Sequence, residues 1–194
     1  MIKHILFGQH GSVKRGEALD YTKPKPGQYL FVFLARPSKQ EIDKTVRDFG
    51  FNRSTLENFS KETHSRRYIS TPFQFVMRGT FLENGKAMFA TLLFALTNQV
   101  LLVASSKEAK YYEELVDDLY EEFRKQKVRS IVHIFCNFLQ EDVDENYEVL
   151  GKIEEQIRDV EMRAALFNSQ TKRPIGAEDI IYLKTQLLKL SRQF

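Results

Sequence analysis

The feature that most restricts the fold of this chain is a long periodic run of apolar residues in its C-terminal third. Between about Val128 and Phe167, apolar residues recur at steps of three, four or seven, and only Gly151 interrupts the run. They are Val143, Leu150, Ile153, Ile157, Val160, Ala164 and Phe167. This spacing is typical of a coiled-coil seam. It predicts one helix of roughly 60 Å, at 1.5 Å per residue, which must project from a small globular body.

A second helix with the same spacing follows after a short polar break. Its apolar residues are Ile180, Leu183, Leu187, Leu190 and Phe194. Two helices joined in this way predict a helical hairpin. We therefore expect an α/β domain over residues 1–127 and a projecting helical hairpin over residues 128–194.

The composition is that of an ordinary packed protein. Of the 194 residues, 42% are hydrophobic, and the net charge of +3 argues against a dedicated nucleic-acid binder. Cys136 is the only cysteine, so no internal disulfide can form, and a reducing compartment and a buried thiol are expected. The apolar stretch from Ala87 to Ala104 contains Thr97-Asn98-Gln99, which predicts a turn between two strands rather than a membrane span. The chain as given is expected to be soluble.

The first 127 residues alternate between strand and helix patterns. Strands are expected at 2–7, 12–17, 29–35, 66–70, 73–82, 86–96 and 99–104, and helices at 38–50, from 54, and at 106–126. Hairpin connections dominate, and Asn84-Gly85 is the strongest turn signal. The prediction is an α/β fold of mixed α+β type. It is an α/β/α sandwich around a mixed, largely antiparallel sheet of six to seven strands.

Two short motifs predict where helices begin. Ser38 with Glu41, and Ser54 with Glu57, have the spacing of capping boxes, in which a hydroxyl and a carboxylate satisfy free backbone N–H groups. Both helices are expected to pack on the sheet.

No motif indicates an enzyme. The four histidines share no metal-ligand spacing, and no Gly-x-Ser-x-Gly elbow is present. The acidic run EDVDENYE at 141–148 has two interpretations. It is a solvated helix face with Val143 and Tyr147 buried behind it, or it holds a hydrated Mg²⁺ ion loosely.

Four segments, in order, resemble the cytoplasmic domain of the CorA family of magnesium and divalent-cation transporters. They are DFGFNRSTLENF at 48–59, QFVMRG with the strands at 92–104, VDENYEVLGKIEEQIRDVE at 143–161, and IYLKTQLLKLSRQF at 181–194. The resemblance covers residues 29–194. It implies a homopentamer whose cytoplasmic domains bind divalent ions, such as magnesium, between protomers and thereby regulate the pore.

The family's Gly-Met-Asn signature and membrane helices do not occur in these 194 residues. The resemblance therefore implies a cytoplasmic fragment that stops before the stalk and membrane helices of a protein of the cell (inner) membrane. The implied partners are further copies of the chain and divalent metal ions. No nucleic acid is implied, and the membrane is implied only through the missing C-terminal part.

The resemblance also implies a regulatory metal site between protomers. Glu57 matches the family's first acidic ligand, whereas Asn58 and Gln140 stand where aspartates are usual. Either Glu141 compensates for the lost charge, or this member is regulated differently. The alternative functions are a zinc-transporting relative of the same family and a soluble coiled-coil adaptor.

Overall fold

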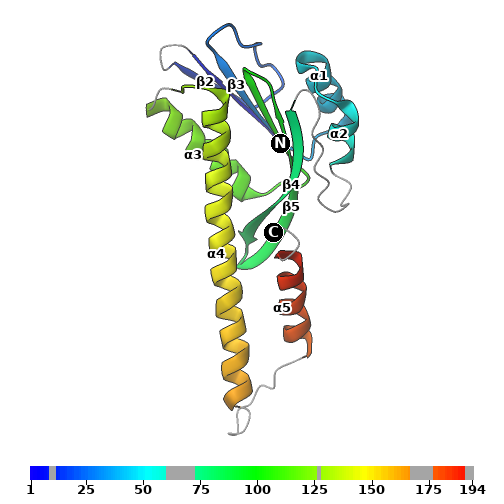
Figure 1. Ribbon diagram of the computed structural model, residues 1–194, viewed down its shortest axis with the longest axis vertical. Helices are drawn as coiled ribbons and strands as arrows, with labels where there is room; N and C mark the ends of the chain where they lie inside the picture. Colours follow the sequence, from blue (N-terminus) through cyan, green and yellow to red (C-terminus); the bar gives the residue numbers. More distant parts are fainter. Residues whose placement is uncertain (9–11, 60–72, 126–127, 167–176, 191–194) are drawn as a thin grey trace. The chain divides into compact units, whose positions relative to one another are not determined.

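The computed structural model describes residues 1–8, 12–59, 73–125, 128–166 and 177–190. The chain forms two compact units (Figure 1). Unit 1 comprises Met1–Gly79 and Phe89–Asp142, and unit 2 comprises Thr80–Met88 and Val143–Phe194. The predicted division into domains at residues 127 and 128 stays a prediction.

A six-stranded sheet is the centre of unit 1. Its strands are β1 (Ile2–Phe7), β2 (Val13–Gly16), β3 (Tyr29–Ala35), β4 (Phe73–Glu83), β5 (Lys86–Leu96) and β6 (Val100–Ser105). The strand order is β2-β1-β3-β6-β5-β4, and the ends of β4 and β5 belong to unit 2. β1 pairs with β2 and β3, and β5 with β6, in antiparallel fashion, whereas β3 and β6 are parallel. The predicted mixed, largely antiparallel sheet is confirmed.

Helices cover both faces of this sheet (Figure 1). They are α1 (Lys39–Phe49), α2 (Arg53–Asn58), α3 (Lys110–Lys125) and the start of α4 (Ile131–Leu166). Strand β3 shows the alternation that produces these layers. Leu30, Val32 and Leu34 belong to the apolar cluster that includes Ile42 of α1 and Leu56 of α2. The residues between them face α3 and α4.

Aromatic contacts define that second layer. Phe33 lies 5.9 Å from Tyr112 of α3, and Phe31 lies 6.0 Å from Phe138 of α4, measured between ring centroids. All four rings are fully buried. The predicted α/β/α sandwich is therefore confirmed.

Two turn signals act as the sequence predicts. Ser38 caps α1 with a full capping box, and Gly50 ends that helix in the left-handed region at φ 70°. Asn84 and Gly85 both have positive φ, at 51° and 71°, between β4 and β5. A two-residue hairpin turn needs this conformation at both positions.

The capping box expected at Ser54 is wrong. The N-cap of α2 is Asn52, whose Oδ1 accepts hydrogen bonds from the backbone N–H of Ser54 at 2.9 Å and of Thr55 at 3.4 Å. The Ser54 hydroxyl also donates to this oxygen, at 2.7 Å. Asparagine is as good a cap as serine, and here it starts the helix two residues earlier. The strand expected at 66–70 lies outside the described residues.

The expected burial of Cys136 is also wrong, because this side chain is exposed. Ile134 and Phe138, each two residues away, are fully buried on α4. Two residues turn a helix by about 200°, so the cysteine lies on the opposite side from both.

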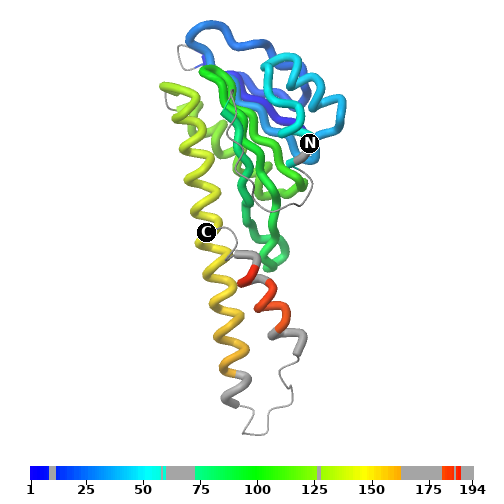
Figure 2. The backbone as a smooth tube through the Cα atoms, turned by 45° about the vertical axis from the view of Figure 1, so that its right-hand side comes forward, coloured from blue at the N-terminus to red at the C-terminus, as the bar shows by residue number. Residues whose placement is uncertain are grey.

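Unit 2 contains the rest of α4 and α5 (Ala177–Leu190), which run side by side as a helical hairpin (Figure 2). In the predicted seam, Ile153 and Leu183 are buried, whereas Val143 is 45% and Leu187 44% exposed. The side chains of Ile180, Ala164 and Leu190, and all of Phe167 and Phe194, lie outside the described set. Among the described helices, none combines the length and the hydropathy that a bilayer crossing requires.

Candidate metal-binding site

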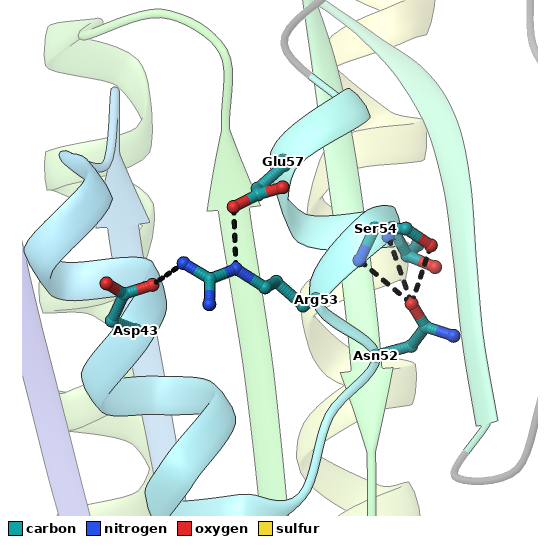
Figure 3. A network of polar contacts seen from close by, with 6 residues as sticks. Asp43, Asn52, Arg53, Ser54 and Glu57 are labelled. Carbon is teal, nitrogen blue, oxygen red and sulfur yellow. Dashed lines mark hydrogen bonds and ion pairs between the residues drawn. The ribbon is translucent and has the colours of Figure 1, made fainter.

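The surface around Glu57 is built by α2 and the neighbouring α1 (Figure 3). Arg53, the first residue of α2, donates from Nε to Glu57 Oε1 at 2.8 Å. Its Nη2 donates to Asp43 Oδ1 on α1. One guanidinium therefore joins two carboxylates from two helices.

All three side chains of this network are partly open to water. Arg53 is 50% exposed, Asp43 41% and Glu57 42%. The hydrogen bond to Glu57, followed by the charges of Asp43 and Glu57, raises the pKa of Arg53 above its ordinary value. The guanidinium therefore stays positively charged, and Glu57 already has a cation beside it.

The other two predicted ligands lie on α4. Gln140 and Glu141 are exposed, and the backbone oxygen of Glu141 accepts a hydrogen bond from Tyr111 Oη at 3.1 Å. Asn58 is the last residue of α2, and its side chain is outside the described set.

The sheet separates these two pairs of residues within one chain. Leu56 of α2 packs on the same face as Leu30, whereas Phe138 of α4 packs on the opposite face against Phe31. Among the described residues, no group of three or more potential ligands (His, Cys, Asp or Glu) is gathered in one place. A site that combines Glu57 with Gln140 or Glu141 would thus need a second copy of the chain, and it stays a prediction.

The acidic run on α4 does not have the expected orientation. Val143 and Tyr147 are 45% and 69% exposed, whereas Asp142 is fully buried. Glu145 is half-buried, and Val149 is fully buried. Steps of three and four place Asp142, Glu145 and Val149 on one stripe of the helix. The stripe that faces inward therefore includes two acids, and the interpretation with Val143 and Tyr147 buried is wrong.

In unit 1, the backbone of β4 at Gly79 lies close to the side chains of Tyr112 and Asp142. A Cβ atom added to Gly79 of β4 would overlap Tyr112 Oη and would lie 3.1 Å from Asp142 Oδ1. Only a glycine leaves space for both polar groups beside this strand. They come from α3 and α4, so no local pattern in the sequence predicts their proximity.

Glu145 links α4 to the β4–β5 hairpin within unit 2. Its Oε1 accepts a hydrogen bond from the backbone N–H of Leu82 at 2.8 Å. Burial raises the pKa of the Glu145 carboxyl, with a further contribution from the charge of Glu148, and the Leu82 hydrogen bond opposes this rise. The folded chain therefore holds a proton on Glu145 more tightly than the unfolded chain does.

We expect Glu145→Gln to stabilise the protein at neutral pH. Stability linked to the raised pKa is fully present below the ordinary value of 4.5 and is lost as the pH rises through the folded value. Glutamine retains the acceptor oxygen for Leu82 and removes the half-buried charge. Because solvent screens this site, the expected gain is only about 1–2 °C in Tm.

Thermal melts of wild type and variant between pH 4 and 8 measure this effect. The wild type should lose Tm relative to Glu145→Gln as the pH rises above the ordinary carboxyl range. Glu154→Gln, an exposed carboxylate change on the same helix, should follow the wild-type profile. Parallel profiles for wild type and Glu145→Gln would show that burial of Glu145 has no energetic effect.

Sequence reasoning missed the two residues that determine the electrostatics at Glu57. Arg53 and Glu57 have the i,i+4 spacing of a helical ion pair, which was available as a signal. Asp43 had no such signal, because its contact with Arg53 joins two helices through tertiary packing.

The model of the family described as CorA-like Mg²⁺ transporter protein matches residues 26–194. No curated protein matches the chain in sequence.

Several solved structures share the fold. Full-length CmaX superimposes with a TM-score of 0.72 at 12% identity, covering 98% of this chain and 58% of CmaX. The soluble domain of CorA from Methanocaldococcus jannaschii gives 0.68 at 15% identity, covering 98% of this chain and 71% of that one. The ZntB cytoplasmic domain from Vibrio parahaemolyticus RIMD 2210633 gives 0.60 at 12% identity, covering 81% of this chain and 64% of that one. This chain thus spans less than two thirds of the length of CmaX.

Proposed function

Because this chain belongs to the family of CorA-like Mg²⁺ transporter proteins, we propose that it is the cytoplasmic regulatory domain of a divalent-cation transporter. The observation that supports this most strongly is the family match over residues 26–194. The mixed six-stranded sheet and the long helix α4, which recur in the soluble domain of CorA, agree with it.

The proposed transporter is a homopentamer in the cell (inner) membrane, with this part of the chain on the cytoplasmic side. Divalent cations are its cargo, and the chain is not an enzyme. Helix α4 has 36 residues, so it is roughly 54 Å long at 1.5 Å per residue. We expect a change in the packing of unit 1 to be transmitted along this helix toward the pore. The change would be a shift between two populated arrangements.

Two experiments test the proposal. Sequencing the gene beyond the codon for Phe194 should reveal two apolar segments of about 20 residues with Gly-Met-Asn between them. The full-length product, reconstituted in vesicles loaded with a Mg²⁺-sensitive dye, should then admit Mg²⁺ when protein-free vesicles do not. A stop codon directly after Phe194 would instead favour the soluble coiled-coil adaptor.

A zinc-transporting member of the same family is the second candidate. The fold does not separate the two, since both CorA and ZntB domains resemble this chain at 15% identity or less. The same vesicles loaded with a Zn²⁺-sensitive dye distinguish them. Zn²⁺ entry without Mg²⁺ entry would identify the zinc transporter.

The predicted regulatory ligands remain part of this proposal as a site between protomers. Glu57 and Asn58 from one copy would face Gln140 and Glu141 from another. The regulatory signal need not be a divalent cation at that site, because the guanidinium of Arg53 already holds the Glu57 carboxylate.

A further inference from the structure

We propose that Arg53 acts as a built-in cation on the surface formed by α1 and α2, and that it excludes divalent cations from Glu57. The inference rests on the regulatory role proposed above, but it removes Glu57 from the divalent-ion ligands of the proposed site between protomers. Its test measures binding to this chain and not transport, so the two proposals can fail separately.

The first support is the way in which the guanidinium uses its donors. Nε binds Glu57 Oε1, and Nη2 binds Asp43 Oδ1, so different N–H groups hold the two carboxylates (Figure 3). A guanidinium is planar and always charged, and its donors have a fixed geometry. Arg53 therefore draws one carboxylate from α1 and one from α2 toward a single positive charge, which is the task a bridging metal ion would otherwise perform.

The second support is the charge around the pair. Lys39 and Arg47 lie one helical turn before and after Asp43 on α1, and both are exposed. Together with Arg53, which pairs with Asp43 directly, they add positive charge to this part of α1. A divalent cation approaching Glu57 would meet a surface that is already compensated, and it would bring its two positive charges next to the guanidinium.

The third support is that the neutral amide oxygen at the N-cap of α2 is already in use. Mg²⁺ prefers oxygen ligands and is usually bound through one or two carboxylates together with waters. The amide oxygen of Asn52 already accepts three donors from Ser54 and Thr55 as the helix cap. It cannot turn toward a metal ion without uncapping α2, which costs about 0.5–2 kcal/mol.

The consequence is that the carboxylates of Asp43 and Glu57 are joined by Arg53 without a divalent ion. A surface that needed Mg²⁺ to neutralise Asp43 and Glu57 would change its packing when the ion binds. On the surface formed by α1 and α2, the side chain of Arg53 already supplies the neutralising positive charge. Any regulation of the transporter through the surface at Glu57 should therefore be insensitive to Mg²⁺.

Removal of the guanidinium tests this inference directly. We expect the Tm of the wild-type chain to be unchanged by Mg²⁺ at about 10 mM, which is about ten times the Kd of the weakest carboxylate-lined Ca²⁺ sites, about 10⁻³ M. Arg53→Gln leaves Asp43 and Glu57 without their shared cation. The same Mg²⁺ should then raise its Tm by about 3–5 °C, as expected for a ligand at roughly ten times its Kd.

Three variants control for other effects, with ionic strength held constant. Arg47→Gln removes one exposed positive charge from α1 but leaves the Arg53 pairs intact, and it should show no Mg²⁺ shift. Arg53→Lys keeps the positive charge without the planar donor fork and should show a smaller shift than Arg53→Gln. The double variant Arg53→Gln with Glu57→Gln should lose the shift gained by Arg53→Gln alone.

Mn²⁺ provides a second readout that does not depend on stability. In two-dimensional NMR, paramagnetic broadening by Mn²⁺ should reach the amide signals of residues 43 and 57 in Arg53→Gln and spare them in wild type. The inference is overturned if Arg53→Gln gains neither the Mg²⁺ shift nor the Mn²⁺ broadening. It is also overturned if wild type shows a Mg²⁺ shift that Glu57→Gln abolishes, a comparison that does not require any Arg53 variant to fold.

Discussion

Replacing Phe94 by alanine should lower the free energy of unfolding by about 3–5 kcal/mol, the range for truncating a fully buried phenylalanine. Its ring stacks on Phe75 with a centroid distance of 4.9 Å and an interplanar angle of 7°. The Phe94 ring also contacts the rings of Phe135 and Phe138 in edge-to-face geometry, each with a centroid distance of 5.6 Å. Alanine would leave a cavity bordered by three rings from β4 and α4, which cannot all move to fill it.

Urea unfolding followed by circular dichroism measures this loss. Phe73→Ala is the matched control, because the Phe73 side chain is 47% exposed although its ring lies 5.4 Å from that of Phe75. The control should cost about 1 kcal/mol or less. Equal losses for the two variants would mean that the aromatic cluster around Phe94 is not a rigid part of the core.

The second large effect is expected at Gly79. A methyl group there would overlap Tyr112 Oη and would lie 2.9 Å from Leu92 Cδ1, and both of those residues are fully buried. We expect Gly79→Ala to cost about 1–3 kcal/mol, as for other overpacked cores. In an open strand position the same change would stabilise by roughly 0.5–1 kcal/mol, so the sign of the effect is informative.

Two comparisons separate the steric effect from other causes. Gly151→Ala on α4 places its methyl group in open space and should stabilise by up to about 1 kcal/mol. Adding Tyr112→Phe to Gly79→Ala removes the overlapping oxygen, so the double variant should lose less than the two single losses added together. Strict additivity would show that Tyr112 does not oppose the methyl group.

The sequence predicted local structure wherever a few neighbouring residues decide it. The capping box of Ser38 and the turn at Asn84-Gly85 were correct, because caps and two-residue turns depend on groups within three or four positions. Strand β3 was predicted to the residue, since its apolar run is bounded by Gly27 and Pro37. The error at α2 arose because two candidate caps, Asn52 and Ser54, lie two residues apart, and Asn52 is the one that accepts the N–H groups of the first turn.

Predictions of which face of a helix is buried were less successful. The steps of three and four on α4 are satisfied by more than one stripe, and the sequence favoured the stripe with Val143. The structure instead buries Asp142 and Val149. A long helix with both polar and apolar residues on several stripes has no unique buried side until its neighbours are placed.

At the candidate site, too, the sequence predicts local contacts but not contacts between separate elements. The resemblance identified Glu57 as the position of interest, and the i,i+4 spacing to Arg53 was present in the sequence. The contact between Arg53 and Asp43 was not, because it joins the start of α2 to the middle of α1, and the relative position of these helices depends on the core beneath them.

For this protein, the sequence by itself determined the family, the order of strands and helices, and the existence of a long helix with a shorter partner. These follow from periodicity and turn chemistry, which act over a few residues at a time. Only the tertiary structure decided that Asp142 is buried, that Cys136 is exposed and that Arg53 also pairs with Asp43 of the neighbouring helix. Each of these depends on which elements pack against one another, and contacts between separate elements leave no periodic trace in the sequence.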